Sequence, residues 1–153
     1  MVEKTLNHYV VNKNTLAICS IASCEFSSIV YEIDQILYVR QTPLKIIQVS
    51  CLANGSTHKG RCMAVSYHTN NRHKLPVPIS EKDSIYFFPT SAPNNFHCHW
   101  ISYHHVLHLQ LAKNQETIIT FRNGLQLTIS VSFYTIEKQL HRTAHLRHLF
   151  SGL

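Results

Sequence analysis

The sequence predicts an α+β fold: a single domain with a mixed or antiparallel β-sheet, one or two central helices and a C-terminal helix. Short runs of branched and aromatic residues fill the N-terminal part, helical patterning follows in residues 42–71, and the chain ends in an amphipathic segment. A length of 153 residues with 44% apolar side chains suits one hydrophobic core, so we expect a single domain over residues 1–153.

The N-terminal strands are predicted where β-branched and aromatic residues cluster between Asn, Ser and Asp breaks. Four such runs are HYVV (8–11), TLAICSI (15–21), SIVYEI (28–33) and QILYVR (35–40). Each is therefore predicted to be a short β-strand.

Two helices are predicted in residues 42–71. In the first, Thr42 can cap the N-terminus, Pro43 suits the first turn, and Gly55 can end the helix in a left-handed conformation. An apolar stripe at helical spacing supports this helix, and it consists of Leu44, Ile47, Cys51 and Leu52. The segment KGRCMAVSYHTNN (59–71) is ambiguous, and we favour a second short helix.

The middle of the chain is predicted to be extended. In KLPVPIS (74–80), each proline pushes the preceding residue out of the helical region. SIYFFPT (84–90) follows as a short buried strand that ends at Pro89. We therefore expect two further strands in this part of the chain.

A third group of strands is predicted after residue 104. HVLHLQL (105–111) alternates between two faces, and the apolar face carries Leu107, Leu109 and Leu111. TIITFRNGLQLTISV (117–131) indicates a hairpin, because Asn123-Gly124 is the favoured pair for a two-residue turn.

The tail, residues 132–153, is predicted to be a helix that Ser132 or Thr135 caps and Gly152 ends. At about 100° per residue, one side gathers apolar groups and the opposite side gathers Lys138, His141, Arg142, His145 and His148. Ordinary solvation is the usual reason for a basic face on one helix. Arg147 projects toward the apolar side. Its guanidinium must therefore pair with a buried acceptor, extend round the helix to solvent, or contact a partner surface.

Positive charge dominates the composition, with 14 Lys and Arg against 8 Asp and Glu. Residues 35–80 and 138–153 contain no acid at all. This layout favours a polyanionic partner, although a merely basic protein would have the same totals. The five cysteines show no C-x-x-C spacing. The sequence shows neither a signal peptide nor an apolar run long enough to span a membrane. We therefore expect a cytoplasmic protein with reduced thiols and no membrane partner.

Motifs for catalysis or nucleotide binding are poor. GSTHKGR (55–61) has two glycines but lacks the Lys-Ser/Thr of a phosphate-binding loop, and it follows a helix rather than a strand. As a basic loop it could still contact nucleic-acid phosphates. The eight carboxylates form no recognisable pair, and G-x-S-x-G and H-E-x-x-H are missing. We therefore predict no catalytic residue and no enzyme activity.

Residues 96–109, FHCHWISYHHVLHL, hold five histidines and one cysteine. In an extended chain two pairs of histidines would each share a face, namely His97 with His99 and His104 with His108. Two such pairs could hold zinc if their strands were neighbours. Structural zinc sites usually have tighter, repeated ligand spacing, and the alternation is also typical of a half-buried strand. No metal site and no cofactor is predicted.

Five stretches of the chain resemble the ComK family of bacterial competence transcription factors: ILYVRQTPLKIIQVSCLANGSTHKGR, KLPVPISEKDSIYFFPT, CHWIS, TFRNG and LHRTAHLRHLF. They follow the family's order and spacing over residues 9–150. The resemblance implies an activator of DNA-uptake genes that recognises AT-rich DNA boxes through the minor groove. It also implies a homo-oligomer, a dimer or tetramer, with RNA polymerase and a protease adaptor as further partners, in a nucleoid-associated location.

The candidate DNA contacts are basic side chains. From the family motifs Arg61, Arg142 and Arg147 carry over, whereas Cys98 and Trp100 are expected to pack in the core. The full candidate set is Lys45, Lys59, Arg61, Arg72, Lys74, Arg122, Arg142 and Arg147. Phosphate contacts would supply most of the affinity and make it salt-dependent, and the narrow groove of AT-rich DNA attracts arginine.

Three expectations concern features of this chain alone. Family members often continue for some tens of residues in a tail associated with adaptor control and full activation, whereas this chain ends at Leu153, so we expect weaker activation or escape from that control. The histidines of residues 96–109 lie outside the family pattern, and their protonation below pH ~6.5 would raise DNA affinity if they lie near the basic surface. The alternative function is a basic protein-interaction module without specific DNA binding.

Overall fold

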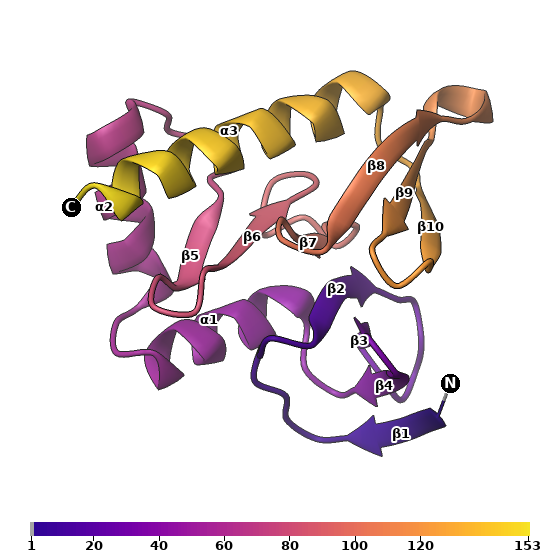
Figure 1. The fold of residues 1–153 in the computed structure, drawn as a ribbon. Helices are drawn as coiled ribbons and strands as arrows, with labels where there is room; N and C mark the ends of the chain where they lie inside the picture. The colour runs from indigo at the N-terminus through magenta and orange to yellow at the C-terminus, as the bar shows by residue number, and fades with distance from the viewer. Residues whose placement is uncertain (1) are drawn as a thin grey trace.

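The computed structural model describes residues 2–153, which form a seven-stranded sheet, a three-stranded sheet and three α-helices (Figure 1). The larger sheet has the order β1-β4-β3-β2-β7-β6-β5, and the smaller one the order β10-β9-β8. β1 runs parallel to β4, whereas the other paired strands are antiparallel. The predicted α+β class with a mixed sheet is confirmed.

The strands of the larger sheet come from the first two thirds of the chain. They are β1 (Val2–Leu6), β2 (Thr15–Ser20), β3 (Ser28–Glu32), β4 (Gln35–Val39), β5 (Val77–Ser80), β6 (Ile85–Pro89) and β7 (Trp100–Ser102). The smaller sheet consists of β8 (Val106–Leu111), β9 (Thr117–Phe121) and β10 (Gln126–Ile129), with a short 3-10 turn, η1 (Lys113–Gln115), between β8 and β9.

The helices are α1 (Pro43–Ala53), α2 (His58–Thr69) and α3 (Phe133–Ser151). A side-chain oxygen caps each N-terminus by accepting a backbone N–H: Thr42 caps α1, Thr57 caps α2 and Ser132 caps α3. Both central helices and the C-terminal helix are confirmed, as are the caps predicted at Thr42 and Ser132.

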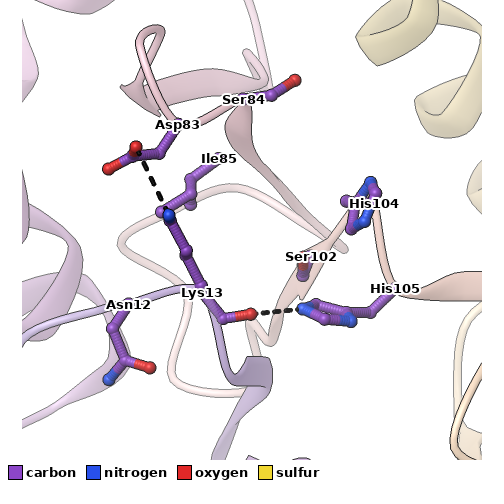
Figure 2. Close-up of a pocket in the computed structure, with 8 residues that line it drawn as sticks. All are labelled: Asn12, Lys13, Asp83, Ser84, Ile85, Ser102, His104 and His105. Carbon is purple, nitrogen blue, oxygen red and sulfur yellow. Dashed lines mark hydrogen bonds and ion pairs between the residues drawn. The ribbon is translucent and has the colours of Figure 1, made fainter.

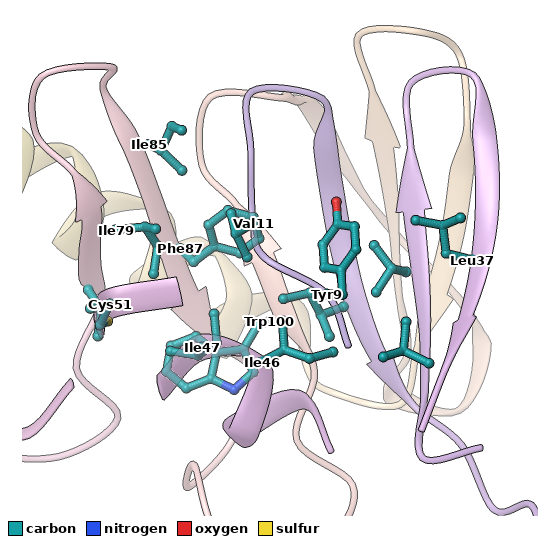
Figure 3. Close-up of a cluster of buried hydrophobic side chains, with 14 of the residues drawn as sticks. Tyr9, Val11, Leu37, Ile46, Ile47, Cys51, Ile79, Ile85, Phe87 and Trp100 are labelled. Atoms are coloured by element: carbon teal, nitrogen blue, oxygen red, sulfur yellow. The ribbon is translucent and has the colours of Figure 1, made fainter. Parts of the chain in front are cut away.

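The central strands β2, β6 and β7 are buried on both faces, because successive side chains alternate between two hydrophobic clusters. The side chains toward α1 include Ile18, Phe87 and Trp100, and those toward the smaller sheet and α3 include Ala17, Phe88 and Ile101. Figure 3 shows Ile46 and Ile47 of α1 beside Trp100. The larger sheet is therefore a middle layer, with α1 against one face and the smaller sheet and α3 against the other.

A third, smaller cluster joins the two outer helices. It consists of Val65 of α2, Leu146 of α3, Leu75 and Tyr86. His68 and Phe150 continue this contact through edge-to-face rings 5.5 Å apart. Val65 is the buried residue of α2, so most of that helix faces outward.

Three local predictions were wrong. HYVV is not a strand, because residues 8–11 form an irregular segment that buries Tyr9 and Val11. The hairpin does not have a two-residue turn. The Phe121 N–H donates to the Leu125 carbonyl, and the Gly124 N–H donates to the Phe121 carbonyl. These bonds close a three-residue loop. Gly124 has φ +91°, the left-handed position that such a loop requires.

The third wrong prediction concerns β8. The strand exists, but a register irregularity between Val106 and His108 interrupts its alternation. Leu107 is 53% exposed and Leu111 is 71% exposed, so the predicted apolar face is buried only at Leu109, in part. β8 is an edge strand of the smaller sheet.

A buried polar network holds the irregular segment before β2. The Tyr9 hydroxyl donates to the Glu32 carboxylate and also contacts the Thr15 hydroxyl. The Asn12 side-chain amide donates to both Tyr9 and Glu32, at 3.2 Å each. Burial and the neighbouring Glu32 raise the pKa of Tyr9, so the phenol stays protonated and acts as the donor.

We therefore expect Tyr9→Phe to lower the free energy of unfolding by about 1–3 kcal/mol, because the buried Glu32 carboxylate loses a donor. Urea unfolding followed by circular dichroism measures this. The control is Tyr134→Phe, which removes the same hydroxyl from a ring that is 71% exposed. Equal unfolding midpoints for the two variants would contradict a stabilising role for the network.

Candidate nucleic-acid interface

α1 and α2 form a pair of helices joined by a turn over residues 54–57. The Thr57 hydroxyl, which ends the turn, accepts the Gly60 N–H at 2.9 Å and so begins α2. Gly55 has φ +102°, so the chain can leave α1 in the left-handed region as predicted. The pair lies at the edge of the molecule that is opposite β9 and β10 (Figure 1).

Arg61 of α2 holds this pair of helices against the larger sheet. Its terminal nitrogens donate to the carbonyls of Asn54 (2.9 Å) and Pro78 (2.8 Å). A Glu81 carboxylate oxygen lies 3.8 Å away, and the Arg61 side chain is only 10% exposed. The guanidinium thus connects the end of α1 with β5, and little of it faces outward.

Arg142 has a comparable role on α3. Its terminal nitrogens donate to the carbonyl of His73 and to the side-chain oxygen of Gln139, both at 2.8 Å. Gln139 in turn donates to the carbonyls of Lys74 (2.8 Å) and Pro89 (2.7 Å). Burial lowers the pKa of the Arg142 guanidinium. This pair of side chains fastens the loop between α2 and β5 to α3.

Two further candidate arginines are exposed but partly engaged. The Nε of Arg122 donates to the His104 carbonyl at 2.9 Å, and the Nε of Arg147 donates to the Ser84 hydroxyl at 2.8 Å. Arg147 thus has a polar acceptor at the surface and lies among the exposed residues of α3. Within residues 2–153, the terminal nitrogens of both arginines form no hydrogen bond or ion pair.

The other four candidates are free cations. Lys45 of α1, Lys59 of α2, and Arg72 and Lys74 of the following loop are all exposed. In the described part of the chain, none of their side chains forms a hydrogen bond or ion pair. Since residues 35–80 contain no acid, all four belong to a stretch without negative charge.

Exposed apolar side chains accompany these cations on α2. Met63 is 66% exposed and Tyr67 is 81% exposed, and with Lys59 they recur at intervals of four residues along one face. We call Lys59, Met63, Tyr67 and Arg72 the α2 face. The sequence prediction included only its cations, although the spacing of four from Lys59 was visible in the sequence.

The histidine-rich stretch is divided between structural and exposed residues. His99 is half-buried, its Nδ1 accepts the Ser20 N–H at 2.9 Å, and burial lowers its pKa. His105 donates from Nε2 to the Lys13 carbonyl at 2.7 Å, beside the Lys13–Asp83 ion pair (Figure 2). Residues 97, 104 and 108 are exposed. Across residues 2–153, no three His, Cys, Asp or Glu side chains lie close enough together to hold a metal ion.

The hollow drawn in Figure 2 has a volume of about 150 Å³. Sites for small molecules usually measure roughly 300–1,000 Å³, so this one is too small for a nucleotide. Its polar groups serve the fold, because Lys13 is paired with Asp83 and with His105.

Cys62 and His58 of α2 form a Cys–His pair, the arrangement in which a histidine can activate a thiol nucleophile. The Cys62 sulfur lies 3.3 Å from Nε2 of His58, one turn earlier on α2. Burial raises the pKa of Cys62 to about 11 and lowers the pKa of His58, so both groups favour their neutral forms. A neutral thiol is a weak nucleophile.

The geometry thus defines a class of protein: a basic α+β protein in which free cations and exposed apolar groups gather on a pair of helices. Comparison with known proteins gives the family. The model of the ComK protein family matches residues 6–152, and the chain belongs to the ComK family. The resemblance identified from the sequence motifs is confirmed.

The chain is also similar to the competence transcription factor of Bacillus subtilis (strain 168). The two are 33% identical over 146 residues, which cover 95% of this chain and 76% of that relative. No solved structure matches the chain. Among the described residues, the helices are too short or too polar to cross a membrane.

We expect Arg61→Ala to lower the free energy of unfolding by about 2–3 kcal/mol, because two carbonyl groups lose a charged donor. Urea unfolding measures this. Lys59→Ala, two residues away on the same helix, is the control and should leave the unfolding midpoint unchanged because Lys59 is exposed. If Arg61→Ala were as stable as Lys59→Ala, the guanidinium would be free to serve another purpose.

A second prediction concerns pH. Since burial lowers the pKa of His99 in the folded protein, the unfolded chain takes up a proton first as the pH falls below about 6.5. Stability is therefore complete above that pH and declines as the pH falls toward the folded pKa. His99→Asn keeps an acceptor for the Ser20 N–H without titrating, so its urea midpoint should fall less between pH 7.5 and 5.5 than that of the wild type. Identical losses would exclude His99 as a source of this dependence.

Proposed function

We propose that this protein is a DNA-binding competence transcription activator without catalytic activity, acting in the cytoplasm on AT-rich duplex DNA. Membership of the ComK family supports the class of function, and the relative from Bacillus subtilis is a competence transcription factor. The net charge of +6 supports a polyanionic partner independently of that similarity.

The observation that carries the proposed interface is the set of four free cations on α1, α2 and the following loop. Lys45, Lys59, Arg72 and Lys74 already have the exposure that phosphate contacts require, whereas Arg61 and Arg142 would have to leave protein acceptors to reach DNA. We therefore propose that these four cations make the principal DNA contacts. Arg61 and Arg142 would contribute by holding α2 and its loop in position.

Met63 and Tyr67 give the α2 face a second kind of contact. Proteins that bind the minor groove combine cations with apolar side chains that enter between base steps, and flexible AT-rich steps favour such contacts. This chemistry supports minor-groove binding by the α2 face. We further propose that the protein acts as a homo-oligomer, with residues 1–153 as one domain.

The proposed function predicts that the double variant Lys59→Gln, Arg72→Gln weakens binding to an AT-rich duplex. The slope of log affinity against log salt should become shallower by about one for each lost phosphate contact. Fluorescence anisotropy over a series of salt concentrations measures both. Lys113→Gln, an exposed cation on the turn after β8, is the matched control and should leave both unchanged.

The same assay with a GC-rich duplex distinguishes the alternative function. A basic protein-interaction module would bind both duplexes equally and weakly, and the binding would vanish at moderate salt. A clear preference for the AT-rich duplex, reduced in the double variant, supports the proposal. Unchanged affinity and salt slope in the double variant would remove the α2 face from the interface.

A further inference from the structure

A groove of about 440 Å³ lies between α3 and β8, on a part of the surface distinct from the α2 face. Its apolar lining includes Leu107 of β8 and Leu140 of α3. Leu107 is 53% exposed. The groove therefore offers apolar surface that the fold itself leaves uncovered.

The charged side chains that line the groove are all positive. Arg122 and Arg147 border it together with three histidines, His104, His108 and His141, and no carboxylate belongs to the lining. Each arginine uses its Nε in the fold and keeps its terminal nitrogens free within residues 2–153. A guanidinium presents such nitrogens as a planar fork that fits a carboxylate.

The groove is bounded by α3 along one side of β8. β8 is paired with β9 on its other side. α3 contacts β8, and Figure 1 shows α3 and β9 on opposite sides of that strand, so the helix covers the strand edge that β9 leaves unpaired. A ligand of the groove therefore meets side chains of α3 and β8 rather than a free strand edge.

We propose that this groove binds an extended acidic segment of a partner protein. The apolar side chains of the segment cover Leu107 and Leu140, and its carboxylates bind Arg122 and Arg147. DNA fits these features less well, because Leu107 and Leu140 line a hollow and so cannot enter between base steps as side chains on a protruding helix can. The proposal is independent of the proposed DNA interface, since the groove and the α2 face share no residue.

The test uses a fluorescein-labelled peptide in which glutamate and leucine alternate, with a lysine–leucine peptide as its charge control. Fluorescence anisotropy should show binding of the acidic peptide alone, and raised salt should weaken it. Leu107→Glu puts a negative charge in the groove and should weaken binding by roughly tenfold or more. Leu111→Glu makes the same change on the same strand, at a residue that is 71% exposed and outside the groove lining, and should bind like the wild type.

A second variant, Arg122→Gln, removes one guanidinium without adding negative charge and should also weaken binding of the acidic peptide. Equal binding of both peptides, equal loss in Leu107→Glu and Leu111→Glu, or no binding of the acidic peptide by the wild type would overturn the proposal. Affinity for an AT-rich duplex should be the same in Leu107→Glu as in Leu111→Glu, because the two variants carry the same added charge. If Leu107→Glu loses DNA affinity instead, the groove belongs to the DNA interface.

Discussion

The structure depends on strands β2, β6 and β7 being buried on both faces. Phe87 and Phe88 are adjacent, both are fully buried, and they point into different clusters. Such strands need a cover on each side, which α1 supplies on one face and the smaller sheet with α3 supplies on the other. The elements that pack on the two faces are far apart in sequence. Two arginines hold the segments between these elements in position. Arg61 fastens α2 beside β5, and Arg142 fastens the loop after α2 to α3.

This use of arginine divides the basic residues into two groups. A guanidinium can donate several hydrogen bonds at once to backbone carbonyls, so it suits the role of a clamp between elements. Lysine carries its charge on a flexible stem, and Lys45 and Lys59 remain exposed on the outer sides of α1 and α2. The exposed cations of residues 35–80, the stretch without acids, are thus mostly those that the fold does not require. A substitution at Arg61 alters the support of α2, whereas one at Lys59 alters only its surface.

Local chemistry predicted most of the fold. The Thr42-Pro43 start of α1 and the paired prolines before β6 were visible in the sequence, because caps and proline act over a few residues. Tyr9 was different: its irregular segment is stabilised by Glu32, which is remote in sequence, and β-propensity favours a strand there. The candidate cations could be predicted from charge, but which of them are free of hydrogen bonds within the fold could not. Whether an arginine meets carbonyls from other elements is decided by tertiary packing.

The histidine-rich stretch shows the same division on a smaller scale. Its composition suggested one shared role for the histidines. In the structure, His99 accepts the Ser20 N–H and His105 donates to the Lys13 carbonyl. His104 and His108 instead line the groove beside α3. The first two need their neutral forms or a fixed donor, so protonation works against the fold at His99. The groove histidines are exposed and lie beside Arg122 and Arg147 in the lining. Acidification therefore acts on this stretch through His99, where it weakens the packing beside β2.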